Sequence, residues 1–208
     1  NVEALKQVIP KDLSAAEISV RLGTTWIPQE DIQQFVMELL TPSQYARGKI
    51  KVRYTEFNGD WFIENKSSDF DNVKANSTYG TKRASAYRII EDTLNLRDVR
   101  IFDYVYDEHG NKKAVFNAKE TTAAQAKQEA VKQAFADWIW KDPERRNRLV
   151  RYYNDTFNCI RPREYDGSHI TFGGISPEIT LRPHQVNAIA HILYGGNTLL
   201  AHKVGAGK

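Results

Sequence analysis

The chain has 208 residues, enough for one large domain or two small ones with a hydrophobic core. Hydrophobic residues make up 41% of it and aromatic residues 11%, which is typical of a folded protein and excludes a disordered one. With 29 basic and 26 acidic residues the formal net charge is +3, so any contact with DNA must come from local patches.

Cysteine content and hydropathy exclude further classes of protein. Cys159 is the one cysteine of the sequence, which excludes an internal disulfide and any metal site built from several cysteines. No stretch is apolar for long enough to cross a bilayer, and the first residues lack the pattern of a secretion signal. We therefore expect a cytoplasmic protein without a membrane partner. A start at Asn1 rather than methionine is compatible with a segment cut from a longer chain.

Two helices are predicted near the N-terminus. Ser14 and Glu17 are spaced for a capping box at the start of a short helix that Gly23 can end. Pro28 then opens a second helix. The apolar residues on one face of this second helix are Ile32, Phe35, Val36, Leu39 and Leu40. The spacing is similar to that of a winged helix-turn-helix, but the second helix carries no Lys or Arg to meet phosphate. Packing on a sheet or a neighbouring domain is the favoured interpretation.

A basic hairpin is predicted from residues 47 to 64. In the sequence RGKIKVRY, the two-residue period of a strand places three cations on one face. These cations are Lys49, Lys51 and Arg53. Asn58-Gly59 supplies the turn, and Trp61 lies on the returning strand. The cations can follow a phosphate backbone while Trp61 stacks on a base. The alternative is a solvated strand face paired to Glu56 and Glu64, with Trp61 in the core.

A second candidate DNA contact lies at the start of the next predicted helix, which runs from Lys82 to about Leu94. A basic first turn opposes the helix dipole unless an anion binds there. Lys82 and Arg83, together with the preceding loop from Tyr79, are therefore candidates to contact a DNA backbone. Solvent exposure of the two side chains is the alternative.

Two strands and two helices are predicted over the following residues. The strands, 99–106 and 113–116, flank a turn at 108–111. Thr121 or Thr122 can cap a long helix whose apolar stripe indicates a core element. Asp142 caps the last helix of this region, which carries arginines beside tyrosines, a combination suited to phosphate contact and base stacking. The candidate DNA contacts on it are Arg145, Arg148 and Arg151.

The stretch from Leu181 to Lys208 has the pattern of a nucleotide-binding segment. Pro183 begins a helix, an apolar run at 198–201 predicts a strand, and a turn with Gly205, Gly207 and Lys208 follows. Closely spaced glycines let backbone N–H groups point at phosphate oxygens, and the lysine supplies a cation to the β/γ-phosphates. His202 stands where the usual pattern has its first glycine. Gln185, at the mouth of the helix, can pair with the adenine edge.

LRPHQ and, about twenty residues later, LLAHKVGAGK resemble the Q-motif and motif I of superfamily-two, Swi/Snf-type DNA translocases. The wider arrangement of YGTKRASAYRIIEDTLNL, WIWKDPERRNRLVRYYNDTFN and REYDGSHITFGG is similar to the large helicase–DNA methylase proteins of bacterial mobile elements and phages. The resemblance covers most of the chain. It implies a segment between a methyltransferase part and a helicase motor, with ATP and Mg²⁺ as cofactors of the whole protein and no activity in the segment alone. It also implies a Ser or Thr after Lys208, which would hold the Mg²⁺.

The expected fold is α+β, with helices on small antiparallel hairpins, followed by the first helix and strand of a RecA-like α/β lobe. We expect an accessory domain over residues 1–174, including a linker at 158–174, and the start of an ATP-binding lobe over 175–208. Two hypotheses about function follow. The accessory domain either contacts DNA for a translocase or is a non-catalytic docking module between methyltransferase and helicase domains. Basic residues that converge on one surface favour DNA, and basic residues that pair with carboxylates favour docking.

Overall fold

The computed structural model describes residues 3, 9–106, 111–160, 163–176 and 178–207. Its contacts divide the chain into two compact units, one of Lys11–Cys159 and one of Asn1–Pro10 with Ile160–Lys208. The expected linker at 158–174 begins where the first unit ends. Helices alternate with small antiparallel hairpins, which confirms the predicted α+β class.

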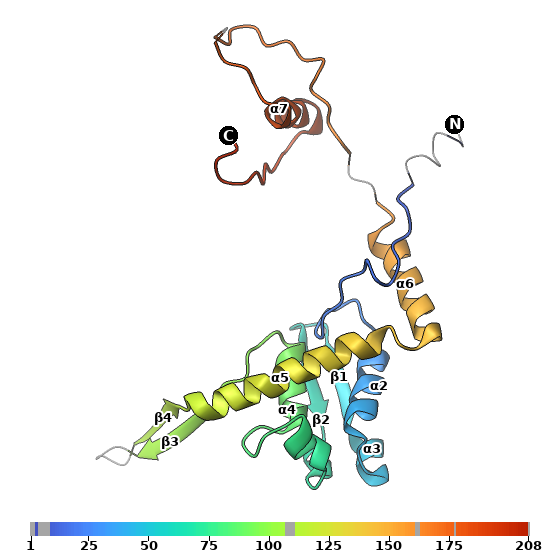
Figure 1. The fold of residues 1–208 in the computed structure, drawn as a ribbon, viewed down its shortest axis with the longest axis vertical. Coiled ribbons are helices and arrows are strands. Elements are labelled where there is room, and N and C mark those ends of the chain that lie inside the picture. Colours follow the sequence, from blue (N-terminus) through green and yellow to red (C-terminus); the bar gives the residue numbers. More distant parts are fainter. Residues whose placement is uncertain (1–2, 4–8, 107–110, 161–162, 177, 208) are drawn as a thin grey trace. The chain divides into compact units, whose positions relative to one another are not determined.

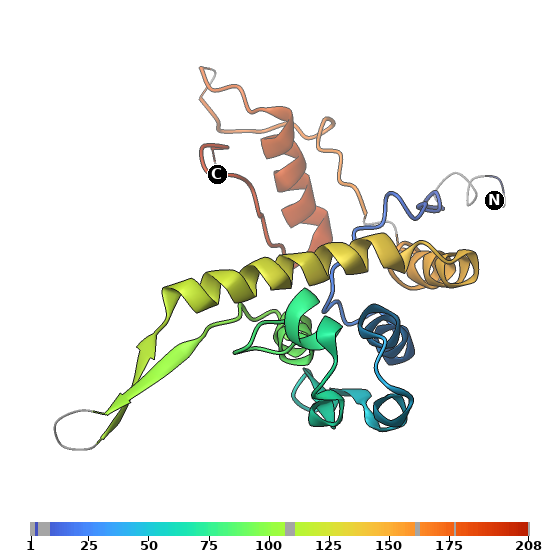
Figure 2. The ribbon, with the colours of Figure 1, turned by 60° about the horizontal axis from the view of Figure 1, so that its bottom comes forward.

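The described residues of the unit Lys11–Cys159 form two hairpins and five α-helices (Figure 1). Its elements are α2 (Gln29–Leu40), α3 (Gln44–Lys49), β1 (Lys51–Thr55), β2 (Asp60–Glu64), η1 (Lys66–Asp69), η2 (Lys74–Thr78), α4 (Ala86–Leu94), β3 (Phe102–Tyr106), β4 (Lys112–Phe116), α5 (Ala118–Ile139) and α6 (Pro143–Phe157). The long helix α5 packs across α2 and α4, and the β3–β4 hairpin extends beyond its first turn (Figures 1 and 2).

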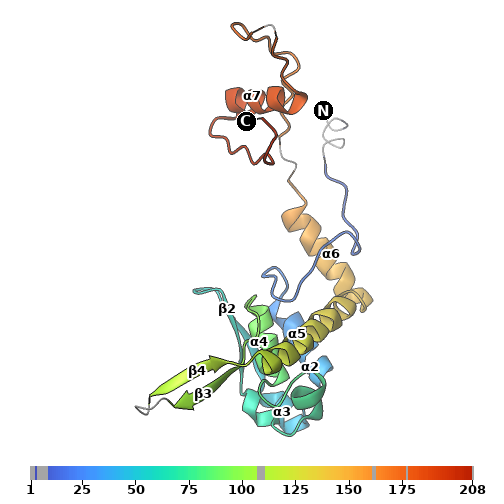
Figure 3. The ribbon, with the colours of Figure 1, turned by 60° about the vertical axis from the view of Figure 1, so that its left-hand side comes forward.

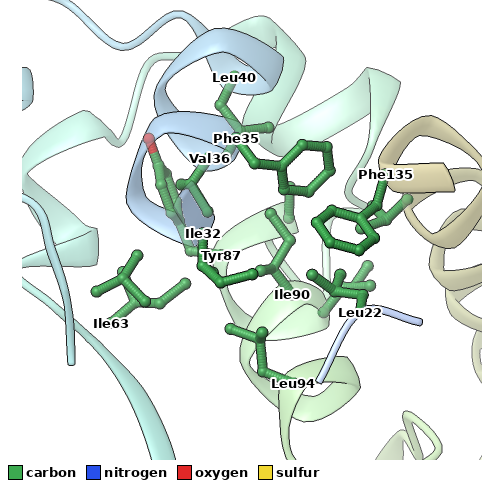
Figure 4. Close-up of a cluster of buried hydrophobic side chains, with 14 of the residues drawn as sticks. Leu22, Ile32, Phe35, Val36, Leu40, Ile63, Tyr87, Ile90, Leu94 and Phe135 are labelled. Carbon is green, nitrogen blue, oxygen red and sulfur yellow. The ribbon is translucent and has the colours of Figure 1, made fainter. Parts of the chain in front are cut away.

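The hydrophobic core lies where α2, α4 and α5 meet the inner face of β1–β2 (Figure 4). Phe35 of α2 meets Phe135 of α5 edge to face, with ring centroids 5.1 Å apart. Tyr87 and Ile90 of α4 are fully buried against them. Each such side chain contributes about 1.5–3 kcal/mol through the apolar surface that it removes from water.

The structure confirms the predicted helix after Pro28 and corrects the one before it. Pro28 is the N-cap of α2, and Thr41 ends the helix in the left-handed conformation, with φ of 45°. Ser14 and Glu17 do make side-chain hydrogen bonds, of 2.7 and 2.8 Å, but they close a single turn and no helix follows. Ile18 and Leu22 lie in this irregular segment, and their side chains are buried. The segment is not helical because tertiary packing outweighs local helix propensity there.

Three further predicted boundaries are wrong. Residues 47–49 end α3 instead of starting a strand, because the Ser43 side chain caps this helix by accepting from the Ala46 N–H. Helix α4 begins after Ser85, so Lys82 and Arg83 precede it. Helix α5 begins after Asn117, whose side chain accepts from the Glu120 N–H and takes the role expected of Thr121 or Thr122. The predicted turn at 108–111 lies mostly outside the described residues.

Helix side chains close both edges of the β1–β2 hairpin. On the β1 edge, Gln33 of α2 accepts from the Val52 N–H at 2.6 Å, and Gln29 accepts from the Tyr54 N–H at 3.1 Å. On the β2 edge, Asn95, the C-cap of α4, accepts from and donates to the Trp61 backbone at 2.8 Å. The spacing of the two elements makes this possible. Residues four apart in a helix are about 6 Å apart along its axis, and residues two apart in a strand are about 6.6 Å apart. Helix side chains one turn apart can therefore bond to alternate residues of the strand.

The same device closes the segment just before β3. Gln128 accepts from the Val99 N–H at 3.2 Å, and the Thr121 hydroxyl accepts from the Ile101 N–H at 3.0 Å. Gln125 donates to the Val99 carbonyl at 3.3 Å. Residues 99–101, predicted as part of a strand, therefore lie along α5 instead of pairing with another strand. Burying the N–H and C=O groups of this segment without hydrogen-bond partners would be costly, and side chains of α5 supply those partners.

The second unit is organised on α7 (Pro183–Gly195), which confirms the helix predicted after Leu181. The loop before it packs on its side, because Asn187 accepts from the Gly167 N–H at 3.0 Å and Tyr165 stacks on His191. A Cβ at Gly167 would lie 2.3 Å from the Val186 carbonyl oxygen, so the loop needs glycine there. Thr198–Ala201 form no strand within the described residues, since a strand needs a neighbour to pair with.

Candidate functional site

The candidate nucleotide site brings together two stretches that are 22 residues apart in sequence. Gln185 lies in the first turn of α7, where its side-chain oxygen accepts from the Arg182 N–H at 2.9 Å. Its amide nitrogen donates to the Gly207 carbonyl at 2.6 Å. His184 donates from Nε2 to the Ala206 carbonyl at 2.8 Å. The start of the helix thus holds the glycine-rich turn by two hydrogen bonds.

Two glycines of that turn have a left-handed backbone conformation. Gly205 and Gly207 have φ of 85° and 73°, values that side chains other than glycine rarely tolerate. A Cβ at Gly207 would also lie 2.8 Å from the Gln185 amide nitrogen. Lys208, the expected phosphate cation, lies outside the described residues. Both ends of the Gln185 amide are engaged, so pairing with adenine requires it to release one of them.

A shallow cavity of about 290 Å³ lies beside this turn and was not predicted. Its aromatic lining comes from Tyr165, His184, His191 and His202. Tyr165 and His191 stack with ring centroids 4.3 Å apart, and the Arg163 guanidinium lies 5.1 Å from the centroid of the Tyr165 ring. One signal was available in the sequence: His184 and His191 are seven residues apart and so share a face of α7.

The expected row of strand cations forms only in part. Lys49 ends α3 and lies over the Tyr45 ring, 3.7 Å from its centroid, so it does not continue the strand alternation. Arg53 makes an ion pair of 3.5 Å with Glu64 on β2. Lys51 is exposed, directly opposite Glu64 in the register. Trp61 is 3% exposed and belongs to the core, which rules out base stacking by its ring in this structure.

Lys82 and Arg83, which precede α4, differ in their contacts. Arg83 donates to Asp103 at 2.7 Å and to the Phe102 carbonyl at 3.0 Å, which fastens it to β3. The bond from Arg83 to Asp103, followed by one from Asn117, holds the pKa of the Asp103 carboxyl below its ordinary value. Lys82 is exposed, and no carboxylate in the described parts of the chain pairs with it. The two cations therefore do not converge at a helix start.

The arginines of α6 do not form one basic surface either. Arg145 is buried and donates to the carbonyls of Ile139 and Trp138, at 3.0 and 2.7 Å, while its guanidinium covers the Trp138 ring. Desolvation lowers the pKa of Arg145. Arg148 pairs with Asp31 of α2 at 2.6 Å. Arg151 pairs with Asp155 and, at 3.0 Å, with Asp12.

A carboxylate beside this cluster gives a prediction about pH. The Trp138 indole N–H donates to Glu38 at 2.6 Å, which is the main reason why the pKa of Glu38 lies below its ordinary value of 4.5. A lowered pKa in the folded state stabilises the fold above the ordinary value, and the gain is lost as the pH falls through the lowered one. We expect Trp138→Phe to make the loss of stability between about pH 5 and pH 3 shallower, with about 0.5 kcal/mol at stake because Glu38 is exposed.

Chemical denaturation at several pH values measures this. Trp138 also packs on Phe35 and Arg145, so its substitution costs stability at every pH, and the diagnostic quantity is the difference in slope. Trp140→Phe is the matched control, since Trp140 packs against the core without bonding Glu38. Parallel pH profiles for the wild type and Trp138→Phe would contradict the assignment.

A second cavity, of about 500 Å³, lies in the first unit between the segment at Val20, the end of α4 and α5. Its rim mixes cations and carboxylates, among them Arg97, Asp98, Glu129 and Lys132. Within the described residues, no group of three or more His, Cys, Asp or Glu side chains is placed to hold a metal ion. None of the described helices is long and apolar enough to cross a membrane.

Comparison with known proteins identifies the larger unit. A family model described as a domain of unknown function, DUF8437, matches residues 21–159. The match covers α2 to α6, and it includes every candidate DNA contact named above. No curated protein and no solved structure matches the chain.

Proposed function

The chain belongs to the DUF8437 family, and from that premise we propose that residues 181–208 are part of the ATP-binding site of a DNA translocase associated with a DNA methyltransferase. We propose further that Lys11–Cys159 is its docking module. The contact between Gln185 and Gly207 carries the first part of the proposal, because the Q-motif-like and motif-I-like stretches meet as they must around one nucleotide. The resemblance of LRPHQ and LLAHKVGAGK to two ATP-binding motifs of superfamily-two translocases also supports a nucleotide site in this segment.

The residues of this segment suit a nucleoside triphosphate. Gly205 and Gly207 leave the turn without side chains that would block phosphate oxygens, and Lys208 would supply a cation. Gln185, released from Gly207, would present both a donor and an acceptor to adenine. When bound, ATP with Mg²⁺ would provide the phosphoryl group whose hydrolysis drives movement.

The experiment measures DNA-stimulated ATP hydrolysis by the full-length product of the gene. We expect Gln185→Ala to lower it about tenfold, the equivalent of about 1.4 kcal/mol, since one hydrogen-bonding group is lost. Gly207→Ala should lower it further, because the added methyl group meets the Gln185 amide in a conformation that favours glycine. The 208-residue chain alone should show no turnover.

Asn197→Ala is the control, an exposed polar residue between α7 and the turn. Its ATPase rate should match that of the wild type. Wild-type rates for both Gln185→Ala and Gly207→Ala, or no ATPase in the full-length product, would refute the nucleotide-binding part of the proposal.

The pairing of the cations favours docking over DNA binding for Lys11–Cys159. Of the eight candidate residues, Arg53, Arg83, Arg148 and Arg151 pair with carboxylates, and Arg145 is buried against carbonyls. A carboxylate beside a cation cancels much of the positive potential that would attract a phosphate. The exposed lysines Lys51 and Lys82 belong to different elements: Lys51 begins β1, and Lys82 lies in the loop before α4. The proposed partners are the neighbouring methyltransferase and helicase domains.

A further inference from the structure

The β3–β4 hairpin differs from every other strand segment of its unit in what covers it. Phe102–Tyr106 and Lys112–Phe116, here called the arm, extend past the first turn of α5 (Figures 2 and 3). All five residues of β4 are exposed, as are four of the five in β3. The edges of β1–β2 and of residues 99–101 are closed by helix side chains, as described above. A two-stranded hairpin without such cover is marginally stable in water.

Apolar side chains lie on both faces of the arm. The register places Phe102 opposite Phe116 and Tyr104 opposite Ala114, so one face carries an aromatic row that continues to Tyr106. The other face is mixed: Val115 lies opposite Asp103, and Val105 lies opposite Lys113. Tyr104 is 60% and Val115 44% exposed. Contiguous apolar surface of this kind marks an interaction site, and tyrosine and phenylalanine are enriched at protein interfaces.

The base of the arm is fixed before any partner binds. Asp103 accepts from Arg83 at 2.7 Å and from Asn117 at 2.7 Å, which ties β3 to the loop before α4 and to the cap of α5. Arg83 also donates to the Phe102 carbonyl on the outer edge. A surface held in place in this way loses little conformational entropy on binding. Asp103 and Arg83 neutralise each other, so the charge that the arm presents comes from elsewhere.

Two lysines supply that charge, one on each face. Lys112 lies opposite Tyr106 and places its ammonium group 4.1 Å from the centroid of the Tyr104 ring, on the aromatic face. Lys113 lies opposite Val105 on the other face. Neither lysine pairs with a carboxylate in the part of the chain that the structure describes.

We propose that the arm inserts into an apolar groove of a neighbouring protein domain, whose two rims carry carboxylates that meet Lys112 and Lys113. A groove can cover the aromatic row and the two valines at once, whereas a nucleic acid strand would use only the aromatic face. Residues 99–117 contain three basic and three acidic side chains, which gives no net field to attract phosphate. This inference rests on the proposed docking function and names the surface and the partner that serve it.

The first experiment introduces a photo-crosslinking phenylalanine derivative into the full-length product at Tyr104 and, separately, at Val115. Both positions should crosslink to the same segment of another protein domain, apolar in sequence and flanked by Asp or Glu. Phe57, at the turn of β1–β2 and 99% exposed, is the control and should yield no such product. Crosslinks only to nucleic acid, crosslinks only to a second copy of the chain, or no crosslinked product at all would overturn the proposal.

The second experiment measures binding of the 208-residue chain to the separately purified remainder of the gene product. Tyr104→Ser with Tyr106→Ser should weaken binding at least tenfold, and Lys112→Glu with Lys113→Glu should weaken it severalfold. Phe57→Ser should bind as the wild type does. Equal binding by the wild type and the arm variants would overturn the role of the arm while leaving docking intact. If the wild type does not bind, the docking function fails, and the proposal about the arm fails with it.

Discussion

Gln128→Leu is expected to lower the free energy of unfolding of Lys11–Cys159 by about 3 kcal/mol. The Gln128 side chain is 2% exposed, and its amide reaches three groups on two segments. It accepts from the Val99 N–H at 3.2 Å and donates to the Arg97 carbonyl at 2.8 Å and the Thr93 hydroxyl at 3.1 Å. Leucine fills a similar volume but leaves the Val99 N–H and the Arg97 carbonyl without a partner, and each buried unsatisfied group costs about 1–3 kcal/mol. The Thr93 hydroxyl keeps its bond to the Ile89 carbonyl.

Urea unfolding followed by tryptophan fluorescence measures this loss, because Trp26, Trp61, Trp138 and Trp140 all lie in that unit. Gln133→Leu is the matched control, the same substitution at an exposed position of α5, and it should change stability by less than about 0.5 kcal/mol. If the two variants unfold at the same urea concentration, the closure of the 99–101 segment by α5 contributes little to stability.

Local signals in the sequence predict the elements that local chemistry determines. Helices α2, α6 and α7 begin where Pro28, Asp142 and Pro183 indicate, because capping and proline geometry involve only neighbouring residues. The bonds that close strand edges join residues such as Gln33 and Val52, which are 19 apart, and no periodicity reveals them. A glutamine on the polar face of a helix looks solvated until the strand beside it is known.

The candidate site divides in the same way. The sequence names Gln185 and Gly207 as candidates for one nucleotide site, but it does not predict the hydrogen bond that joins them. The sequence shows that the arginines are positively charged, but it does not show which carboxylates they pair with. Arg148 and Asp31 are 117 residues apart, and Arg83 reaches Asp103 across 20. A run of cations in sequence therefore predicts charge but not whether that charge is available to DNA.

Arg148→Met is expected to destabilise Lys11–Cys159 by about 2 kcal/mol and to leave unchanged any affinity that the protein has for DNA. Asp31 is 4% exposed in its side chain, one of its oxygens lies 2.6 Å from Arg148 Nη2, and the other has no hydrogen-bond partner. Removing the arginine leaves a buried carboxylate unpaired, which costs about 3–5 kcal/mol in a fully buried pair. The estimate is lower here because the Arg148 side chain is 54% exposed.

The double variant Asp31→Leu/Arg148→Met removes both charges and should recover most of the lost stability, since an apolar pair can replace a buried ion pair. Salt-dependent DNA binding of the folded variants then separates the two hypotheses. A residue that contacts phosphate contributes about one unit to the slope of log affinity against log salt concentration. If Arg148→Met keeps its stability and lowers that slope, Arg148 faces DNA, and the docking interpretation of its ion pair with Asp31 is wrong.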